Sequence, residues 1–472
     1  MKRTVAIQVG AISFIDEGVE PVLDLFQDNA GVNNLFLASH TFDRGTGGRQ
    51  IPGYPLPDHG KREYDLGFRG GNFATIHPQY YHNTFIRDFA APPQDTGGWD
   101  ILEKVLPAAA KRGIDVFCWM TENPYAPLPR LMASFAQASE IDPWGRRTGI
   151  PCFRNPAYRN WHLGIFEDTV KSYAIQGIAF CSERQGPLGH LMTSGFIGGG
   201  RIRGGLGCFC PHCSERMHRE GINVERARIG YRELAAFFQA ARNAVRPPDG
   251  YFVTFWRLLL KHPEILAVEQ FWTAGLKEMY AELYGTVKAI TPQVKVGWHV
   301  MHLQSFSPFY RAETDFAELA DYADFIKSVM YHNCAGARYQ RFVESLHQTI
   351  FRDAEPEESY RFLYRILDIE EAAWKDLPLA GFSADYVSRE TKRALAGVAG
   401  KCEIWPGIDI DIPVEKELGK ARDESPADVK AAVIAAFEAG AQGVVLSRKY
   451  SEMRLANLAA VGEALREAGA SW

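Results

Sequence analysis

The chain has 472 residues, of which 46% are hydrophobic, 12% aromatic and 23% charged, and its formal net charge is −5. This length and apolar content support a large core, which excludes the intrinsically disordered classes. The slightly acidic balance and the lack of a long basic run argue against a nucleic-acid partner. No apolar run is long enough to span a bilayer, and eight cysteines in so long a chain do not suggest a secreted disulfide framework. We therefore expect a cytoplasmic protein with no nucleic-acid or membrane partner.

The first residues, MKRTVAIQVGAISF, combine a basic tip with a short apolar run that contains Gln8. The run lacks a convincing cleavage site and is short for the apolar part of a signal peptide. We therefore interpret this stretch as a first β-strand and not as a leader.

Short β-branched or aromatic runs then alternate with amphipathic stretches along the whole chain. The predicted strands are Val5–Gly10, Asn34–Ser39, Asp115–Met120, Gly177–Ser182, Val294–His299, Phe325–Met330, Glu403–Ile408 and Gly443–Ser447. The predicted helices include Val19–Gln27, Trp99–Arg112, Asn160–Tyr173, Trp272–Ile290 and Ala427–Ala439. Arg112-Gly113, Gln176-Gly177 and Ala439-Gly440 fit helix ends at which a left-handed glycine precedes a strand.

This alternation predicts an α/β fold, a single (β/α)8 TIM barrel over residues 1–472. The rival fold is a doubly wound sheet, which normally carries a Gly-rich phosphate turn after its first strand. The segment after Gly10 reads AISFIDEG and has no such turn. The barrel is therefore the favoured interpretation.

Two long excursions follow predicted strands, at about 41–98 and 184–250. The first is full of Gly, Pro, His and Tyr, and the second contains GGGRIRGGLGCFCPHC and a helical stretch. Loops this long are uncommon without a purpose. In a barrel both would lie at the C-terminal face, where active sites are built.

Polar side chains follow each predicted strand, and in a barrel they would converge on one basin. Carboxylates together with Trp119, Trp298 and Trp405 would suit a sugar, because aromatic rings pack on its C–H faces while carboxylates and amides bind its hydroxyls. Glycoside cleavage typically uses two carboxyl groups, one as acid and one as nucleophile or base. The residues expected to bind substrate are His40, His77, Trp119, Asn123, Arg184, Gln185, Trp298, His299, Asn333 and Asp409.

Three carboxyl groups are the predicted catalytic residues. Glu183 comes first, and the structural alternative is an ion pair with Arg184, its neighbour. Asp16 comes second, and its alternative is a helix N-cap before GVEPVLDLF. Glu122 is held in reserve. Arg184 also has the geometry to bind a carboxylate of the substrate in a bidentate manner.

Cys208, Cys210 and Cys213 form a C-x-C-x-x-C pattern in the second excursion. Zn²⁺ in structural sites prefers four tetrahedral nitrogen or sulfur ligands, so a fourth ligand is needed. Cys152 is our choice for it, with Cys118, Cys181 and His212 as alternatives. Such a site would staple a loop, and free or disulfide-linked cysteines are the other interpretation.

The motifs SFIDEG, CFRNPAYRNW, SERQGPL and CFCPHC together resemble a group of barrel proteins classed as glycoside hydrolases. CFCPHC also resembles the zinc cluster of the trimeric barrel β-galactosidases. Those enzymes carry an Asn-Glu acid/base after the fourth strand and a nucleophile Glu after the seventh. Here Ser182 precedes Glu183, and WPGIDID lacks a Glu. This departure argues against a retaining mechanism with two glutamates.

A second resemblance is to the inverting exo-sialidases built on a TIM barrel. It implies an Asp after the first strand with Arg and Asn around the sugar acid, and Asp16, Arg184 and Asn333 are the corresponding residues. Here the third strand ends in Glu122-Asn123, where a catalytic His cannot be aligned.

The sequence thus predicts a glycoside hydrolase, with an inverting exo-glycosidase of sialidase type as its specific version, and with Glu183 as acid. A metal-dependent sugar isomerase, epimerase or lyase, with Glu183, His299 and Asp409 as ligands, is one alternative. A carbohydrate-binding barrel that has lost catalysis is the other. We expect a carbohydrate substrate and no catalytic cofactor, with a structural zinc and a homo-oligomer left open.

Overall fold

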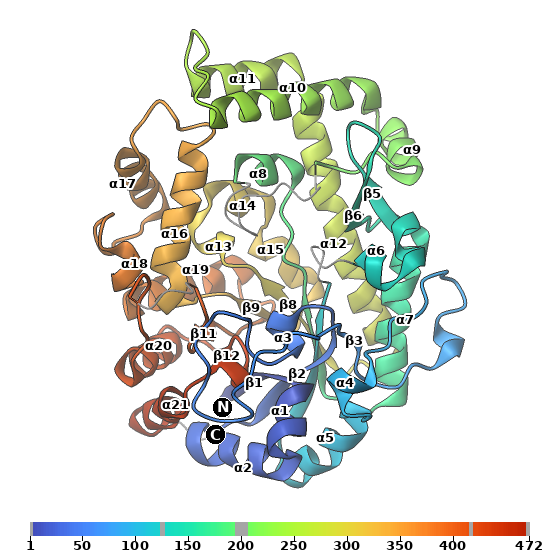
Figure 1. The fold of residues 1–472 in the computed structure, drawn as a ribbon, viewed down its shortest axis with the longest axis vertical. Helices are drawn as coiled ribbons and strands as arrows, with labels where there is room; N and C mark the ends of the chain where they lie inside the picture. The colour runs from blue at the N-terminus through green and yellow to red at the C-terminus, as the bar shows by residue number, and fades with distance from the viewer. Residues whose placement is uncertain (1–2, 123–127, 194–205, 415–418, 469–472) are drawn as a thin grey trace.

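A ring of parallel strands lies at the centre of the molecule (Figure 1). The structure is a computed structural model and describes residues 3–122, 128–193, 206–414 and 419–468. The strands of the ring are short, almost wholly buried runs rich in β-branched and aromatic residues. They are β1 (Thr4–Gly10), β2 (Asn34–Thr41), β4 (Asp115–Thr121), β7 (Gly177–Cys181), β8 (Lys295–Val300), β9 (Phe325–Ser328), β10 (Glu403–Ile404), β11 (Gly407–Asp409) and β12 (Gly443–Ser447).

The ring is closed by the segment that contains β10 and β11. The hydrogen-bonded order is β10-β9-β8-β7-β4-β2-β1-β12-β11, so its two ends belong to one stretch of chain. In that stretch, the N–H of Trp405 donates to the carbonyl of Ile326 on β9, and the carbonyl of Pro406 accepts from Val445 on β12. The nine strands therefore occupy eight positions, and the predicted (β/α)8 barrel is confirmed.

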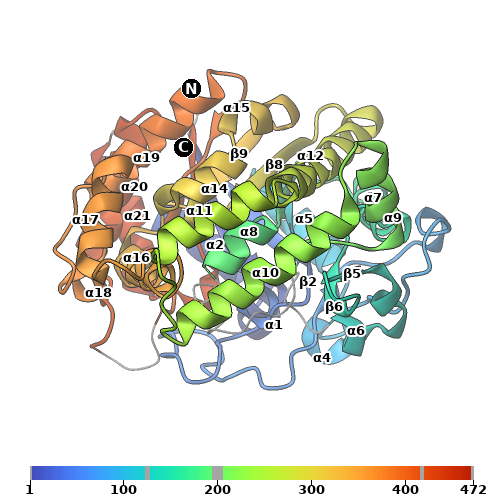
Figure 2. The same cartoon turned by 90° about the horizontal axis from the view of Figure 1, so that it is seen from above.

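Helices on the outside of the ring cover the strands (Figures 1 and 2). In chain order they are α2 (Val19–Ala30), α5 (Ile101–Lys111), α7 (Pro156–Ser172), α12 (Glu264–Ile290), α15 (Phe316–Leu319) with η3 (Ala320–Tyr322), α19 (Ala384–Val398), α20 (Pro426–Glu438) and α21 (Leu455–Glu467). The five helices expected from sequence are all present, and four of them differ from the prediction by at most four residues at either end, while α12 begins eight residues earlier than the predicted Trp272. Only the helix after β8 is reduced to short turns.

The left-handed glycines at helix ends are confirmed at two of the three expected places. Gly113 and Gly440 have φ angles of 64° and 103°. Gly177 is different, because it is the first residue of β7. A Cβ there would come within 2.6 Å of the Phe117 ring, so packing inside the barrel requires this glycine.

The lower half of the barrel interior, away from the C-terminal ends of the strands, is aromatic. The rings of Phe36, Phe117, Phe325 and Trp405 stack there, with Phe325 and Trp405 4.3 Å apart between centroids. Towards the C-terminal ends of the strands the inward residues become polar and include Gln8 and Lys327. The apolar half fixes the core, and the polar half forms the floor of the basin.

The connections at the C-terminal face carry additional elements. Those in the two expected excursions are α3 (Arg44–Gly47), β3 (Gly71–Asn72), η1 (Pro78–Tyr80), α4 (Pro93–Thr96), α8 (Pro187–Met192), α9 (Pro211–Arg219) and α10 (Val224–Arg242). The second excursion continues past its expected end at residue 250 and also contains α11 (Tyr251–Lys261). Two further excursions follow β4 and β9, and they contain α6 (Leu128–Leu131), η2 (Ala133–Ala138), β5 (Ser139–Ile141), β6 (Arg147–Pro151), α16 (His332–His347), α17 (Pro356–Leu367) and α18 (Leu377–Ala380). Short elements complete the other connections, namely α1 (Ala11–Glu17), α13 (Leu303–Phe306), α14 (Pro308–Glu313) and η4 (Tyr450–Glu452).

Within the described part of the chain, no helix combines the length and the apolar character needed to cross a membrane.

Candidate active site

Glu183 stands at the mouth of the barrel, two residues beyond the end of β7. Its side chain is 53% exposed, and its Oε1 lies 3.1 Å from Nε2 of His299 on the neighbouring strand β8. Cys181, His299 and Lys327 occupy paired positions on β7, β8 and β9. Because paired residues of parallel strands face the same side, these side chains share the barrel interior with Glu183.

The surroundings of Glu183 keep its carboxylate ionised. Desolvation by the surrounding barrel mouth acts to raise the pKa of Glu183, but the hydrogen bond from His299, the charge of that ring when it is protonated, and the charges of Arg338 and Lys327 lower it to about 2. Burial and the charge of Lys327 lower the pKa of His299 below its usual value, so its imidazole is neutral at pH 7. At neutral pH His299 thus acts on Glu183 by donating its Nε2 proton, and Arg338 and Lys327 add positive charge.

Arg338 lies on α16, beyond the end of β9. It packs 5.7 Å from the centroid of the Tyr331 ring, and its Nη1 donates to Nδ1 of His302 over 3.3 Å. Among the described residues, no carboxylate lies within ion-pair distance of Arg338. Its charge is therefore free to act on Glu183 and on a group that enters the basin.

Arg184 points away from this carboxylate into the core. Its Nη1 donates to Oε1 of Glu122 over 3.0 Å, and its Nη2 donates to Oε1 of Glu140 over 2.7 Å. The guanidinium also lies over the ring of Phe153, 4.1 Å from its centroid. Arg184 is 3% exposed and lines a cavity together with His299, and because its guanidinium is bonded to two carboxylates it is not available to pair with a carboxylate of the substrate. The expected roles in binding substrate and in pairing with Glu183 are both corrected.

Glu122 belongs to the same buried cluster. Its oxygens accept hydrogen bonds from the hydroxyls of Tyr158 and Ser182 as well as from Arg184. Its side chain has no exposed surface. The reserve role of Glu122 as a catalytic carboxylate is therefore corrected to a structural one.

Asp16 does not share the basin with Glu183. It lies in α1, and both its oxygens accept from the guanidinium of Arg49 over 2.6 and 2.7 Å. The small cavity beside it is lined by other residues, including Ser13, His59 and Ser451. The expected pairing of Asp16 with Glu183 is corrected, and so is the alternative that Asp16 caps a helix N-terminus.

The two other histidines expected to bind substrate lie on the helical side of the strands. A β-bulge after Ala38 turns His40 outwards, where its ring meets those of Trp161 and His162 on α7. Burial, followed by the nearby His162, lowers the pKa of His40 to about 3. His77 bonds through Nδ1 to Asp168, also on α7, over 2.7 Å. Neither faces the basin, which corrects both assignments.

Of the tryptophans expected in the basin, Trp119 alone lies in the upper barrel interior. Its Nε1 is buried and has no hydrogen-bond acceptor among the described residues. Trp298 faces outwards, stacks on Tyr280 at 4.4 Å and donates to the carbonyl of Tyr322. Trp405 lies in the lower half of the barrel. The role assigned to Trp298 is corrected.

The remaining polar candidates are buried at the rim. Gln185 donates to the hydroxyl of Thr193 at the end of α8. Asp409 has no exposed surface and accepts from the N–H groups of Cys334 and Ile412, which ties β11 to α16. Asn333 is 5% exposed, and its Oδ1 has no described partner. These positions correct the substrate roles of Gln185 and Asp409. Asn123 lies outside the described residues.

Sequence reasoning missed several residues of the site. Asp43 is exposed just beyond β2, and its Oδ2 lies beside Gly45 together with the guanidinium of Arg448. Lys327 lies on β9, Tyr331 lies between β9 and α16, and Arg338 lies on α16. A polar residue inside a strand was the available signal for Lys327, and the position two residues past a strand end was the signal for Asp43.

Four buried thiols come together away from the barrel axis. The sulfurs of Cys152, Cys208, Cys210 and Cys213 all lie within 4.8 Å of one another, with the Cys152 sulfur 3.5 Å from Cys213 and 3.8 Å from Cys210. A tetrahedral zinc with bonds of about 2.3 Å requires sulfurs about 3.8 Å apart. The arrangement thus fits a closed thiolate site, with Cys152 as the fourth ligand.

A second group of donor atoms is formed by Cys181, Glu183 and His299, which also approach within 4.8 Å. Asp409, the third ligand of the expected isomerase site, is not part of it. Lys327 and Arg338 place positive charge beside Glu183, which opposes a bound cation.

No protein-family model matches this chain, and no curated protein matches its sequence. Its structure is similar to solved barrels. The glycoside hydrolase domain of PgaB (BpsB) from Bordetella bronchiseptica shares 13% identity, with coverage of 99% of this chain and 98% of that chain and a TM-score of 0.50. The β-galactosidase of the haloarchaeon Halorubrum lacusprofundi shares 13% identity over 99% of this chain, with a TM-score of 0.52.

The β-galactosidase of Marinomonas ef1 shares 10% identity over all of this chain, with a TM-score of 0.51. The chain spans 58% and 61% of the length of the two β-galactosidase chains. At such identities the likeness is one of fold. The chain has the barrel architecture found in these glycosidases.

Proposed function

We propose that this protein is a glycoside hydrolase whose catalytic carboxylate is Glu183. The proposal rests on one observation, that an accessible and ionised carboxylate stands at the mouth of the barrel and receives a hydrogen bond from a neutral histidine. A carboxylate that is ionised at neutral pH serves as nucleophile or base, and a proton donor needs a raised pKa. We therefore assign Glu183 as base or nucleophile in place of the acid role expected from sequence.

Asp43 is our candidate for the second carboxyl group of the reaction. It is exposed just beyond β2, where its Oδ1 accepts from the N–H of Gly45 and its Oδ2 lies beside the guanidinium of Arg448, while Glu122 and Asp409 are buried. One strand, β4, separates β2 from β7 in the ring. Two strand spacings of about 4.8 Å put the two strand ends about 10 Å apart. The distance between the two carboxyl groups distinguishes inverting from retaining enzymes, and we propose the inverting arrangement.

An acidic sugar is the substrate we favour. Arg338 offers a guanidinium without a carboxylate partner among the described residues, and Arg is suited to bidentate binding of a carboxylate. Exo-action on a sialoside is thus the specific form of the proposal, with Arg338 in the role first expected of Arg184.

A panel of nitrophenyl glycosides that includes a sialoside, a glucuronide and a β-galactoside tests the function. Glu183→Gln removes the carboxylate charge but keeps an acceptor for His299. It should lower kcat by a factor of about 10³ or more with an unchanged melting temperature. Glu438→Gln, an exposed position at the end of α20, is the matched control and should keep full activity. Full activity of the Glu183 variant would rule out the assignment.

A further inference from the structure

Lys327 is a buried lysine in the interior of the barrel. It lies on β9 and is 1% exposed. Its Nζ donates to Oε1 of Gln8 on β1 and to the hydroxyl of Tyr331, each over 2.8 Å. β1 and β9 are not neighbours in the ring, so the amine reaches across the barrel, beneath the basin.

This buried cation has no carboxylate in contact. Among the described residues, none forms an ion pair with Lys327, and its two hydrogen-bond acceptors are neutral. Burial lowers the pKa of Lys327 to about 7, and the carboxylate of Glu183 acts in the opposite direction. Burying an ammonium group without an ion-pair partner costs free energy. We therefore look for a function of Lys327 in the basin above it.

The titratable groups that face Glu183 come from several elements. They are Cys181 on β7, His299 on β8, Lys327 on β9, Tyr310 on α14, Tyr331 beyond β9 and Arg338 on α16. His299 is neutral, and burial first of all keeps Cys181 and the two tyrosines protonated. At neutral pH the positive charge near Glu183 therefore comes from Lys327 below and from Arg338 at the side, and His299 adds to it at lower pH, where its ring takes up a proton.

We propose that Lys327 is a positioning residue that holds Glu183 in its ionised form from beneath, through charge and without contact. Cys181, His299 and Lys327 are paired across adjacent strands, which keeps the amine at a fixed place relative to the carboxylate. Substrate does not touch this amine, because the residue is closed off from the basin. The inference rests on the proposed role of Glu183 in hydrolysis.

The test compares Lys327→Gln with Lys327→Arg in the full chain. Gln removes the charge but keeps polar atoms for Gln8 and Tyr331, and Arg keeps the charge. The acidic limb of the kcat/KM profile should move up by about one pH unit or more in the Gln variant and stay near the wild type in the Arg variant. A limb that does not move in a folded Gln variant overturns the inference.

A second measurement needs no substrate. With glutamate carboxyls labelled with ¹³C, the resonance lost in Glu183→Gln identifies Glu183, and its titration gives the pKa directly. A rise of this pKa in Lys327→Gln supports the inference even if no glycoside is cleaved, a result that would count against the proposed function alone. An unmoved pKa overturns the inference while the hydrolase proposal stands.

Lys449 is the matched control. It is also buried, but its Nζ donates to the backbone carbonyls of Arg44, Gly48 and Arg49. Lys449→Gln should lower the melting temperature without moving the Glu183 titration. An equal shift in both variants would mean that the loss of any buried lysine has this effect, and it would overturn the specific role of Lys327.

Discussion

Arg184 and Glu183 are adjacent in the chain but belong to different environments. Successive residues at the end of a strand point to opposite sides, so Glu183 faces the basin while Arg184 enters the core between Glu122 and Glu140. Burial raises the pKa of Glu140 to about 7, and the positive charge of Arg184 works against that rise. The guanidinium therefore fixes the chain at the position where Glu183 leaves the strand.

Removing this guanidinium should be costly. We expect Arg184→Met to lower the free energy of unfolding by about 3 to 5 kcal/mol, because it leaves two buried carboxyl groups without their shared cation. Urea denaturation at pH 7 measures the loss. Arg361→Met, at an exposed ion pair on α17, should cost less than about 1 kcal/mol. Similar losses of unfolding free energy in the two variants would contradict a stabilising role of Arg184 between Glu122 and Glu140.

The sequence allowed some of these residues to be located but not their partners. Glu183 and His299 were found because they follow or end apolar runs that read clearly as strands. That Arg184 bonds to Glu122 and Glu140, and not to Glu183, depends on contacts across 62 and 44 residues of chain. His40 was misplaced because a bulge in β2 reverses its direction, and nothing in the local pattern marks a bulge.

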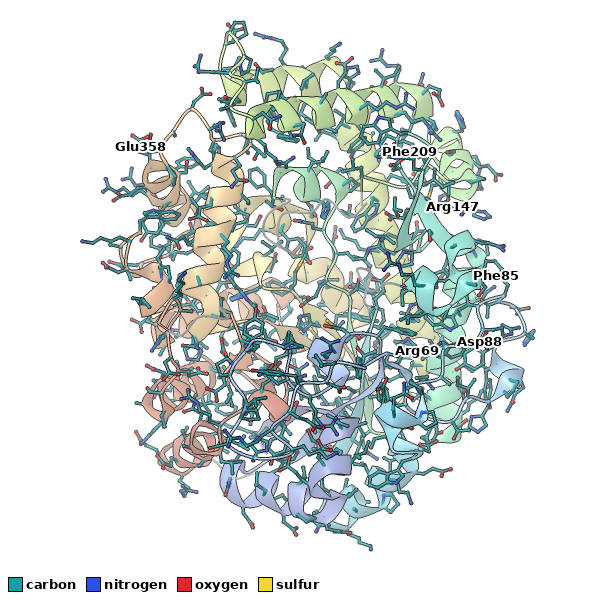
Figure 3. The ribbon with its side chains drawn as sticks, in the orientation of Figure 1. Arg69, Phe85, Asp88, Arg147, Phe209 and Glu358 are labelled. Atoms are coloured by element: carbon teal, nitrogen blue, oxygen red, sulfur yellow. The ribbon has the colours of Figure 1, made fainter. Side chains whose placement is uncertain are left out.

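At the scale of elements, the four thiols join parts of the C-terminal face that are distant in sequence. Cys152 follows β6, and the other three precede or begin α9. The N–H of Phe209 also donates to the carbonyl of Ile141 on β5, so this loop lies along the β5–β6 hairpin. Figure 3 shows Phe209 of the loop and Arg147 of the hairpin on the same side of the molecule. The four thiols thus lie where a bound metal would tie this loop to the β5–β6 hairpin.

We propose that these thiols bind a structural zinc. The purified protein should contain about one zinc per chain, and Cys210→Ser should lose it and melt at a lower temperature, because metal binding contributes to folding. Cys402→Ser, at a half-buried cysteine outside the cluster, should keep the metal. Mass spectrometry that finds a disulfide between cluster cysteines in place of zinc would contradict the site.

The barrel elements were predictable because each strand is an apolar run of the length that a parallel core strand needs. The excursions after β4 and β9 were not. Their short helices, such as α6 and α18, carry too few turns for a periodic pattern to emerge. Arg338 lies in the excursion after β9, and Lys327 lies on β9, directly before that excursion.

Over the whole molecule, buried titratable groups act on stability in opposite directions. Burial lowers the pKa of His162 and His332 to about 3, so these groups favour folding above the usual histidine pKa and oppose it as the pH falls. Burial raises the pKa of Glu269 and Glu424 well above the usual value, and these groups oppose folding as the pH rises. The pH dependence of the free energy of unfolding is therefore a sum of opposing contributions. The contribution of one group is obtained by comparing the wild type with a variant that lacks only that group.

Glu269 offers the clearest such difference. It is 8% exposed, its Oε2 accepts from the N–H of Leu188 at the start of α8, and it lies beside the carboxyl group of Glu313. The folded protein keeps a proton on Glu269 that the unfolded chain has lost above its ordinary pKa. Its stabilising contribution is thus fully present below that ordinary pKa and is lost as the pH rises. Gln in its place imitates the protonated form at every pH.

We therefore expect Glu269→Gln to be as stable as the wild type near pH 4.5, with a gain in stability that grows steadily from pH 5 to pH 8. Chemical denaturation at several pH values measures this difference, in which the contributions of titratable groups distant from Glu269 cancel because they are common to both proteins, while Glu313 responds together with Glu269 as its partner. Glu438→Gln should show no such trend, because that side chain is exposed. A gain that does not change with pH would mean that Glu269 ionises in the folded protein as it does in the unfolded chain, and that the start of α8 does not depend on a protonated carboxyl pair.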